Sequence, residues 1–227
     1  MQIIEALNWR YDTKRMNGNK IPTEKLDCIL EAIRLAPSAM GLQPYTIIVI
    51  ENIELMKKIQ PIANLQQEIT EASVLLVFAS WNKITPERIN EHLKRISLVR
   101  DMNENSLKLT REKMEMLLNN TVEENFIWSA KQAYLALGIG MTAAALEKVD
   151  TTPIDHFNNA DLDEVLQLKE RGLRSILLLS LGYRDTAKDL TIANKKVRRE
   201  REKLFITLQS TIGFNATNIN NKGSITL

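Results

Sequence analysis

Basic side chains gather near the two ends of the chain. Arg10 and Lys14 lie four residues apart near the N-terminus, which is one turn if the segment is helical. The second cluster, near the C-terminus, consists of Lys195, Lys196, Arg198 and Arg199. Taken singly, each cluster is more typical of a solvated surface. In a chain whose formal net charge is only +2, however, two such clusters could converge on one phosphate group.

The segment TTPIDHF, residues 151–157, is a second candidate for ligand binding. Pro153 is predicted to begin a short turn, and Asp155 and His156 follow it. The backbone N–H groups of such a turn can point at an atom of a ligand. An exposed histidine in an ordinary loop accounts for the same residues equally well, so both interpretations stay open.

Motifs for other kinds of chemistry are missing from the chain. It contains neither GxGxxG nor GxxxxGK[ST], and it has no nucleophile elbow centred on serine. His92, His156 and the single cysteine, Cys28, are too scattered to make a clustered metal site. An enzyme with so few reactive side chains would take its chemistry from a cofactor. The sequence therefore predicts no catalytic side chain and no metal.

The segment LAPSAMGLQPYTIIVI passes from a predicted helix to a predicted strand through an unusual connection. Pro37 ends the helix, because proline lacks an N–H and disfavours helical geometry at the preceding residue. Ser38 and Gly41 are among the small residues that follow, and small residues let a flat ligand approach the backbone closely. An ordinary connecting loop is equally consistent with this segment alone.

The elements that must position these residues can be read from apolar runs. Residues 45–50, 73–80 and 175–183 are predicted strands of a central sheet, covered on both faces. A helix is predicted over 23–36, and the charged segment 86–118 is predicted to form surface helices. Residues 127–147 are apolar almost all round and predict a buried helix. Its small residues are expected at a subunit interface, in preference to an internal contact: Ala130, Ala133, Ala136 and Gly140.

Length and composition restrict the class of protein. The 227 residues allow one domain or two small ones, and a single cysteine excludes an internal disulfide. No signal peptide opens the chain, and no apolar run reaches the roughly 18 residues of a membrane span, so we expect a cytoplasmic protein without a membrane partner. Nucleic-acid binding is also disfavoured, because no aromatic residues are interleaved with the basic segment KKVRRERE.

Seven segments, taken together and in order, resemble the flavin-dependent (FMN) nitroreductase family. They are WRYDTK, APSAMGLQPY, ITEASVLLVFA, WSAKQAYLALG, PIDHF, LKERGLRSILLLSLGYR and KKVR. The resemblance is closest to the NAD(P)H-dependent nitroreductase and dihydropteridine reductase branch. It assigns residues 1–205 to an FMN-binding domain and leaves 206–227 as a polar C-terminal tail. It implies an α+β fold with a central, mostly antiparallel sheet flanked by helices, and a domain-intertwined homodimer with two shared FMN sites.

The resemblance also implies roles for individual residues. Arg10, Lys196 and Arg198 correspond to phosphate-binding residues, and Lys14 corresponds to a lysine at the pyrimidine edge of the flavin. Contacts to the flavin of the partner subunit would come from Pro37, Ser38 and Gly41. The backbone of the turn at Pro153, Asp155 and His156 would meet flavin N5 and O4. Tyr11, Asp12 and Gln66 complete the expected cofactor-binding set, and Met114 and Met116, in a predicted lid, are expected to contact the substrate.

Three residues depart from the family pattern. His156 stands where glycine is common, and Glu68 stands where Gln or Lys is typical. Asp12 would repel the expected phosphate unless it pairs with a nearby arginine.

The reaction implied by the resemblance is a ping-pong oxidoreduction. NADH or NADPH would give hydride to flavin N5, and a nitroaromatic, quinone or pteridine would then take the reducing equivalents in the same pocket. Lys14 would stabilise the anionic reduced flavin. The three departures keep an alternative open, which is a catalytically degenerate flavin-binding protein without efficient turnover.

Overall fold

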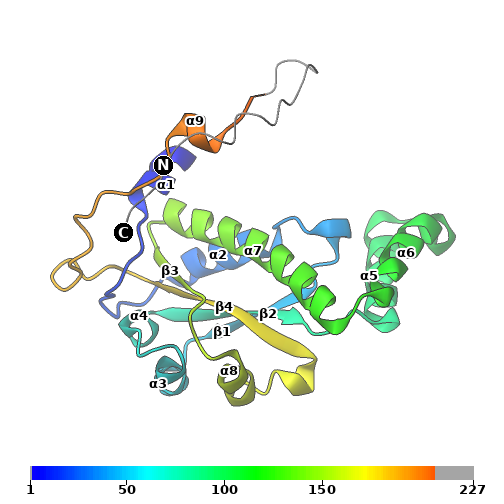
Figure 1. Ribbon diagram of the computed structural model, residues 1–227, viewed down its shortest axis with the longest axis horizontal. Coiled ribbons are helices and arrows are strands. Elements are labelled where there is room, and N and C mark those ends of the chain that lie inside the picture. The colour runs from blue at the N-terminus through cyan, green and yellow to red at the C-terminus, as the bar shows by residue number, and fades with distance from the viewer. Residues whose placement is uncertain (1, 208–227) are drawn as a thin grey trace, which may run out of the picture. The chain divides into compact units, whose positions relative to one another are not determined.

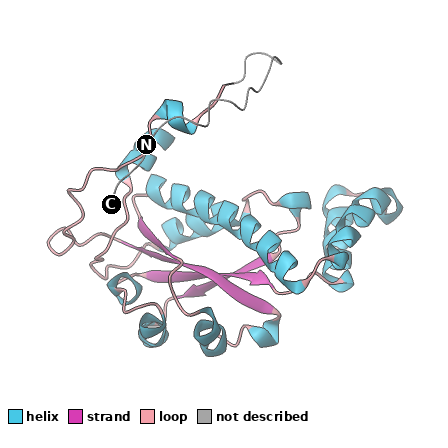
Figure 2. Ribbon diagram, viewed as in Figure 1, coloured by secondary structure: helices cyan, strands magenta, loops and turns pink. Residues whose placement is uncertain are grey.

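Four antiparallel strands form one sheet at the centre of the structure, a computed structural model that describes residues 2–207. The strands are β1 (Tyr45–Ile50), β2 (Val74–Trp81), β3 (Asp150–Ile154) and β4 (Leu173–Gly182), in the order β1-β2-β4-β3. Leu76 of β2 lies opposite Val49 of β1 on one side and Leu179 of β4 on the other. Both central strands are apolar nearly throughout because helices cover both faces of the sheet (Figures 1 and 2).

Two layers of helices sandwich the sheet. One face packs against α2 (Thr23–Arg34) and α7 (Val122–Leu146), and the other against α3 (Ile53–Ile62) and α8 (Asn159–Val165). Side chains alternate between these faces along β2, so that Phe78 joins the first core and Val77 the second. The α+β class and the helix-flanked antiparallel sheet are therefore confirmed.

The remaining helices are short or lie beyond one end of the sheet. They are α1 (Ile3–Trp9), η1 (Ala39–Gly41), α4 (Gln67–Thr70), α5 (Pro86–Arg100), η2 (Glu104–Leu107), α6 (Lys108–Glu115), η3 (Met116–Asn119), η4 (Lys169–Arg171) and α9 (Arg201–Leu204). Helices α5 and α6 enclose a smaller apolar cluster of their own. The chain divides into a unit of residues 1–194 and a unit of residues 195–227, so α9 is described by itself. The predicted tail lies almost wholly outside the described residues.

Local sequence sets the helix boundaries. At the start of α7, the side chains and backbone N–H groups of Thr121 and Glu124 form a reciprocal capping box. Helix α5 starts with Thr85 as its cap and Pro86 in its first turn, and the residue after its end, Asp101, is in the left-handed region.

Residues 151–154 are a strand, so the prediction of a turn beginning at Pro153 is wrong. Proline lacks the N–H that a ladder uses, and it is tolerated here because β3 is an edge strand and Pro153 is exposed. β3 ends at Ile154, and an irregular loop begins at Asp155. The expectation that 45–50 is covered on both faces is also only partly met, since β1 is the other edge strand and Val49 is 41 % exposed.

The prediction that the small residues of α7 face another subunit is wrong for three of them. Ala133 and Ala136 are buried in the core that α7 shares with α2, and a Cβ atom on Gly140 would lie 2.7 Å from Ile33 Cγ1. Ala130 is half-buried. The exposed face of α7 is instead formed by larger apolar residues: Ile127, Tyr134, Leu135, Ile139 and Leu146.

Over residues 2–207, no helix combines the length and the apolar character that crossing a membrane requires.

Candidate cofactor site

The segment that carries Arg10 and Lys14 is extended. Helix α1 ends at Trp9, and Arg10 has φ −67° and ψ 145°. Arg10 and Lys14 therefore do not share a helical turn. Both side chains are half-buried, and the position of the segment is fixed by two buried carboxylates.

The first of these carboxylates is Asp189, which is 3 % exposed. Its Oδ2 accepts hydrogen bonds from the Tyr11 hydroxyl at 2.8 Å and the Lys14 backbone N–H at 2.9 Å, and Oδ1 accepts two from Thr191. Burial opposes ionisation of Asp189, but these donors outweigh it and lower its pKa to about 2. Burial and the bond to Asp189 raise the pKa of Tyr11 to about 12. Tyr11 thus contributes as an anchor of this segment.

The second buried carboxylate, Asp150 at the start of β3, holds Thr13 and Arg184. The Arg184 guanidinium lies 2.5 Å from Asp150 Oδ1 and stacks over the rings of Trp9 and Tyr11. Thr13 Oγ1 donates to Asp150 Oδ1 at 3.3 Å, and the Thr152 hydroxyl donates to the Thr13 carbonyl at 2.5 Å. The N-terminal segment is therefore held along β3.

Lys14 lies between two carboxylates of different character. Its ammonium is 2.8 Å from Asp12 Oδ2 and 3.5 Å from Glu68 Oε1. The Asp12 side chain is 56 % exposed, whereas that of Glu68 is 4 % exposed. Burial raises the pKa of Glu68, although Lys14 acts in the opposite direction. Asp12 would repel a phosphate unless it pairs with a nearby cation, and its partner here is this lysine instead of an arginine.

The turn after β3 adjoins the loop between α3 and α4. The Asn64 side chain donates to the His156 carbonyl at 3.0 Å, and the Asn158 backbone N–H donates to the Ile62 carbonyl at 3.1 Å. Asp155 and His156 are exposed, and their backbone N–H groups donate no hydrogen bond to any described group. Gln66 is half-buried, and its amide donates to Ala63 of its own loop.

Three segments that are distant in sequence thus come together. Residues 10–14 contact Glu68 through Lys14 and β3 through Thr13, while Asn64 contacts His156. This surface, formed by 10–14, 64–68 and 155–156, is called the Lys14 surface below. It combines the half-exposed side chain of Lys14 with two backbone N–H groups that donate to no described group, which suits a ligand that is anionic or rich in hydrogen-bond acceptors.

The Pro37–Gln43 loop lies elsewhere on the same chain. Its backbone is left-handed at Met40 (φ 55°), Gly41 (φ 66°) and Gln43 (φ 47°). It is held by the Gln132 side chain, which accepts from Ala39 N–H at 2.8 Å, and by His92 Nε2, 3.1 Å from the Met40 carbonyl. His92 belongs to α5, and Figure 1 places α4 and α5 at opposite ends of the sheet. Pro37, Ser38 and Gly41 are thus far from Lys14 within one chain.

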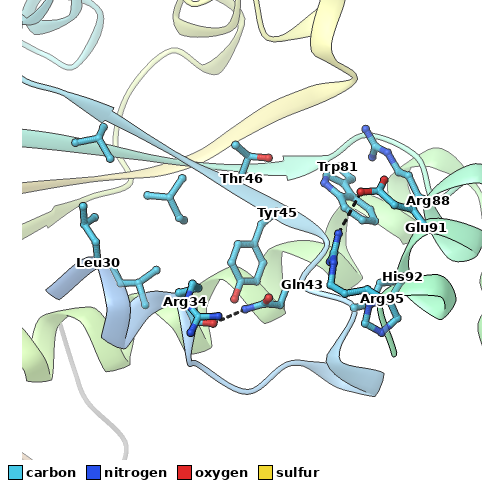
Figure 3. Close-up of a pocket in the computed structure, with 14 residues that line it drawn as sticks. Leu30, Arg34, Gln43, Tyr45, Thr46, Trp81, Arg88, Glu91, His92 and Arg95 are labelled. Atoms are coloured by element: carbon cyan, nitrogen blue, oxygen red, sulfur yellow. Dashed lines mark hydrogen bonds and ion pairs between the residues drawn. The ribbon is translucent and has the colours of Figure 1, made fainter. Parts of the chain in front are cut away.

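A cavity of about 460 Å³ opens beside this loop, between α2, β1 and α5 (Figure 3). Leu30, Ile33, Ile47 and Val49 give it apolar walls, and Arg34, Arg88 and Arg95 lie among its polar lining residues. Arg95 pairs with Glu91 at 3.1 Å, and Arg88 stacks over Trp81. None of the residues predicted to bind the cofactor lines this cavity in the described part of the chain.

Five predicted residues lie outside both groups. Pro153 is exposed within the edge strand β3. Lys196 and Arg198 are exposed, and they belong to the unit of residues 195–227. Met114 is fully buried in the apolar cluster of α5 and α6, so it does not face a binding surface as predicted. Met116 is 68 % exposed.

Sequence reasoning missed Asp189, Asp150 and His92 as supporting residues. Asp189 contacts Tyr11, and Asp150 contacts Thr13. The two residues of each pair are more than a hundred positions apart in sequence. No local pattern marks such pairs. The only feature of the sequence that could have indicated their burial is an apolar neighbour, Val149 for Asp150 and Leu190 for Asp189.

Comparisons with known proteins agree with this architecture. The family model described as the Nitroreductase family matches residues 7–183. A Bacillus subtilis protein provisionally named NAD(P)H nitroreductase YfkO is 34 % identical over 196 residues, covering 81 % of this chain and 89 % of the relative. A Staphylococcus saprophyticus protein with the same provisional activity in its name is 33 % identical over 199 residues, covering 81 % of this chain and 89 % of the relative.

Two solved structures share the fold. One is described provisionally as an NAD(P)H:FMN oxidoreductase from Staphylococcus epidermidis, with a TM-score of 0.80, 22 % identity, and coverage of 91 % of this chain and 96 % of that chain. The other is described provisionally as a nitroreductase, in complex with FMN, from Exiguobacterium sibiricum, with a TM-score of 0.78, 19 % identity, and coverage of 92 % and 98 %. Together with the family match, which spans well over half of the sequence, they place the molecule by both sequence and fold: the chain belongs to the nitroreductase family of oxidoreductases.

Proposed function

We propose that this protein is an FMN-dependent oxidoreductase that passes reducing equivalents from NADH or NADPH to nitroaromatic, quinone or pteridine acceptors by a ping-pong mechanism. The observation that carries the proposal is the family match over residues 7–183, which contains all three segments of the Lys14 surface. The relatives' names support a nicotinamide reductant. The solved relative in complex with FMN supports the flavin.

The residues of the Lys14 surface fit such a cofactor. Lys14 has a half-exposed ammonium group with three donors, and its two carboxylate partners leave a donor for the ring. Asp155 and His156 are exposed residues whose backbone N–H groups donate to no described group, so these donors suit hydrogen-bond acceptors at the ring edge. When bound, FMN would supply the two-electron chemistry that no side chain of this chain provides. Arg10, Lys196 and Arg198 are proposed to bind its phosphate, within a flavin domain of residues 1–205.

The positions of the two groups of residues support a homodimer. The Pro37–Gln43 loop and the Lys14 surface lie toward opposite ends of the sheet, so one chain does not bring both to one flavin. We propose that the loop contacts the flavin held mainly by the partner subunit, in a domain-intertwined arrangement. The exposed apolar face of α7 is the proposed contact between subunits. Met116 is proposed to face the acceptor.

Reconstitution and steady-state kinetics test this function. Purified protein should bind FMN with a yellow colour and oxidise NADH or NADPH in the presence of menadione or a nitrofuran. Double-reciprocal plots at several acceptor concentrations should be parallel, as a ping-pong cycle requires. Protein that does not bind FMN would contradict the proposal. Protein that binds FMN without turnover would favour the alternative, a degenerate flavin-binding protein, which Asp12, Glu68 and His156 motivate.

A further inference from the structure

Glu68 is a buried acid whose charge is not fully compensated. Its side chain is 4 % exposed, and its nearest cation is Lys14, with 3.5 Å between Nζ and Oε1. Among the residues that the structure describes, no group donates a hydrogen bond to this Oε1 atom. A buried carboxylate oxygen without a hydrogen bond costs about 1–3 kcal/mol or more in many proteins, so this oxygen opposes folding.

The Lys14 ammonium is shared between two carboxylates, Asp12 and Glu68. Asp12 lies closer to it than Glu68, at 2.8 Å, but Asp12 is exposed to water, which screens its charge. Glu68 lies in the protein interior, where a charge acts over a longer range. If all three groups are ionised, the cluster of Asp12, Lys14 and Glu68 carries a net charge of −1.

We propose that Glu68 is a positioning residue that pairs with Lys14, offsets part of its charge beside the cofactor and so makes the bound flavin a stronger reductant. This inference rests on the proposed function. Reduced FMN carries an additional negative charge on its ring, and a free ammonium group would bind that form more tightly than the oxidised form. Pairing Lys14 with a buried carboxylate weakens this preference. The flavin then gives up its electrons more readily, which suits acceptors that are hard to reduce.

The test is the midpoint potential of bound FMN in the full-length protein, measured by anaerobic titration against a reference dye. In Glu68→Gln, reduced FMN should gain at least tenfold in affinity relative to oxidised FMN, equivalent to a rise of about 30 mV for a two-electron couple. Glu164→Gln on α8 removes the same charge from an exposed site and should leave the potential unchanged. Asp12→Asn should give a smaller rise than Glu68→Gln.

A double-mutant cycle shows whether Glu68 acts through Lys14. Glu68→Gln should not raise the potential in a Lys14→Gln background. An equal rise in that background, or no rise in the single variant, would overturn the inference. Wild-type protein that fails to bind FMN would instead overturn the proposed function. If Glu68→Gln fails to fold, Glu68→Ala measured in the same way decides between these outcomes.

Discussion

At the scale of single residues, the site depends on Asp189, a carboxylate that is not itself among the predicted cofactor-binding residues. It accepts hydrogen bonds from Tyr11, from the Lys14 backbone and from Thr191, and so holds the segment that carries Arg10 and Lys14. Its position is 178 residues from Tyr11 in sequence. The positions of Tyr11 and Lys14 on the Lys14 surface therefore depend on a residue that lies far from both in sequence.

Replacing Asp189 by alanine should lower the free energy of unfolding by about 2–4 kcal/mol, because several buried donors would lose their acceptor at once. Urea denaturation measures this loss. Asp185→Ala is the matched control, since the Asp185 side chain accepts hydrogen bonds from Ala187 and Lys188 within its own turn. An equal loss in both variants would contradict the role assigned to Asp189.

The contribution of Asp189 should also depend on pH. Its pKa falls to about 2 in the folded protein from an ordinary value of 3.8. A carboxyl group with a lowered pKa stabilises the fold fully above its ordinary pKa and loses that contribution as the pH falls through its folded value. The difference in stability between wild type and Asp189→Ala should therefore be constant above pH 4 to 5 and shrink by about 2 kcal/mol toward pH 2. A constant difference over this range would show that the carboxylate is not the source of the effect.

At the scale of elements, the Pro37–Gln43 loop is a strained connection held from outside. Three of its residues adopt left-handed backbone geometry, and two of those, Met40 and Gln43, are not glycine. Such geometry persists only where surrounding contacts enforce it. His92 of α5 and Gln132 of α7 supply those contacts. Because His92 Nε2 lies against a carbonyl, that nitrogen carries the proton.

His92→Phe should loosen this loop while leaving the sheet intact, since phenylalanine fills the space but cannot donate to the Met40 carbonyl. Hydrogen exchange at Gly41 and Leu42 N–H, which bond within the loop, should speed up by about fivefold for the roughly 1 kcal/mol lost with one hydrogen bond. Glu91→Gln, on the same helix but paired only with Arg95 among the described residues, should leave exchange unchanged. Unchanged exchange in His92→Phe would show that other contacts fix the loop geometry, such as those of Gln132 with Ala39 and of Gln43 with the Arg34 carbonyl.

The sequence predicted the elements that dominate the core and missed those that depend on long-range partners. The strands over 45–50, 73–80 and 175–183 were predicted nearly to the residue, because their apolar β-branched and leucine runs are strong local signals. β3 was missed since Pro153 is a strand breaker everywhere except at an edge. Lys14 and Glu68 could not be paired without the fold. Met114 was predicted to lie in a lid. Its burial depends on how α5 and α6 pack together, which no local pattern in the sequence shows.

At the scale of the whole molecule, two faces of α7 have different roles, one in the core of the chain and one on its surface. Its small residues let α2 approach closely within the chain, as Gly140 against Ile33 shows. Its exposed face carries large apolar side chains, among them Tyr134 at 47 % and Leu135 at 49 % exposure. An apolar stripe of this kind on a helix that is otherwise buried is typical of an interface with another subunit. Folding and the proposed dimerisation thus depend on different faces of one helix.

Leu135→Glu should therefore dissociate the proposed dimer without unfolding the chain. The two copies of an isologous interface would each bury an unpaired carboxylate, and a cost of about 2 kcal/mol per copy weakens association by about a thousandfold. Size-exclusion chromatography with light scattering should show a monomer, circular dichroism should show the wild-type helix content, and bound FMN should be lost because the Pro37–Gln43 loop of the partner no longer reaches it. Leu98→Glu, on α5 at a position 83 % exposed, is the control and should stay dimeric and yellow. Gly140→Leu should instead lower the stability of the chain itself, by about 1–3 kcal/mol from overpacking against Ile33. A Leu135→Glu protein that remains a dimer with FMN bound would place the interface on another face, and a monomer that keeps FMN would place the whole flavin site within one chain.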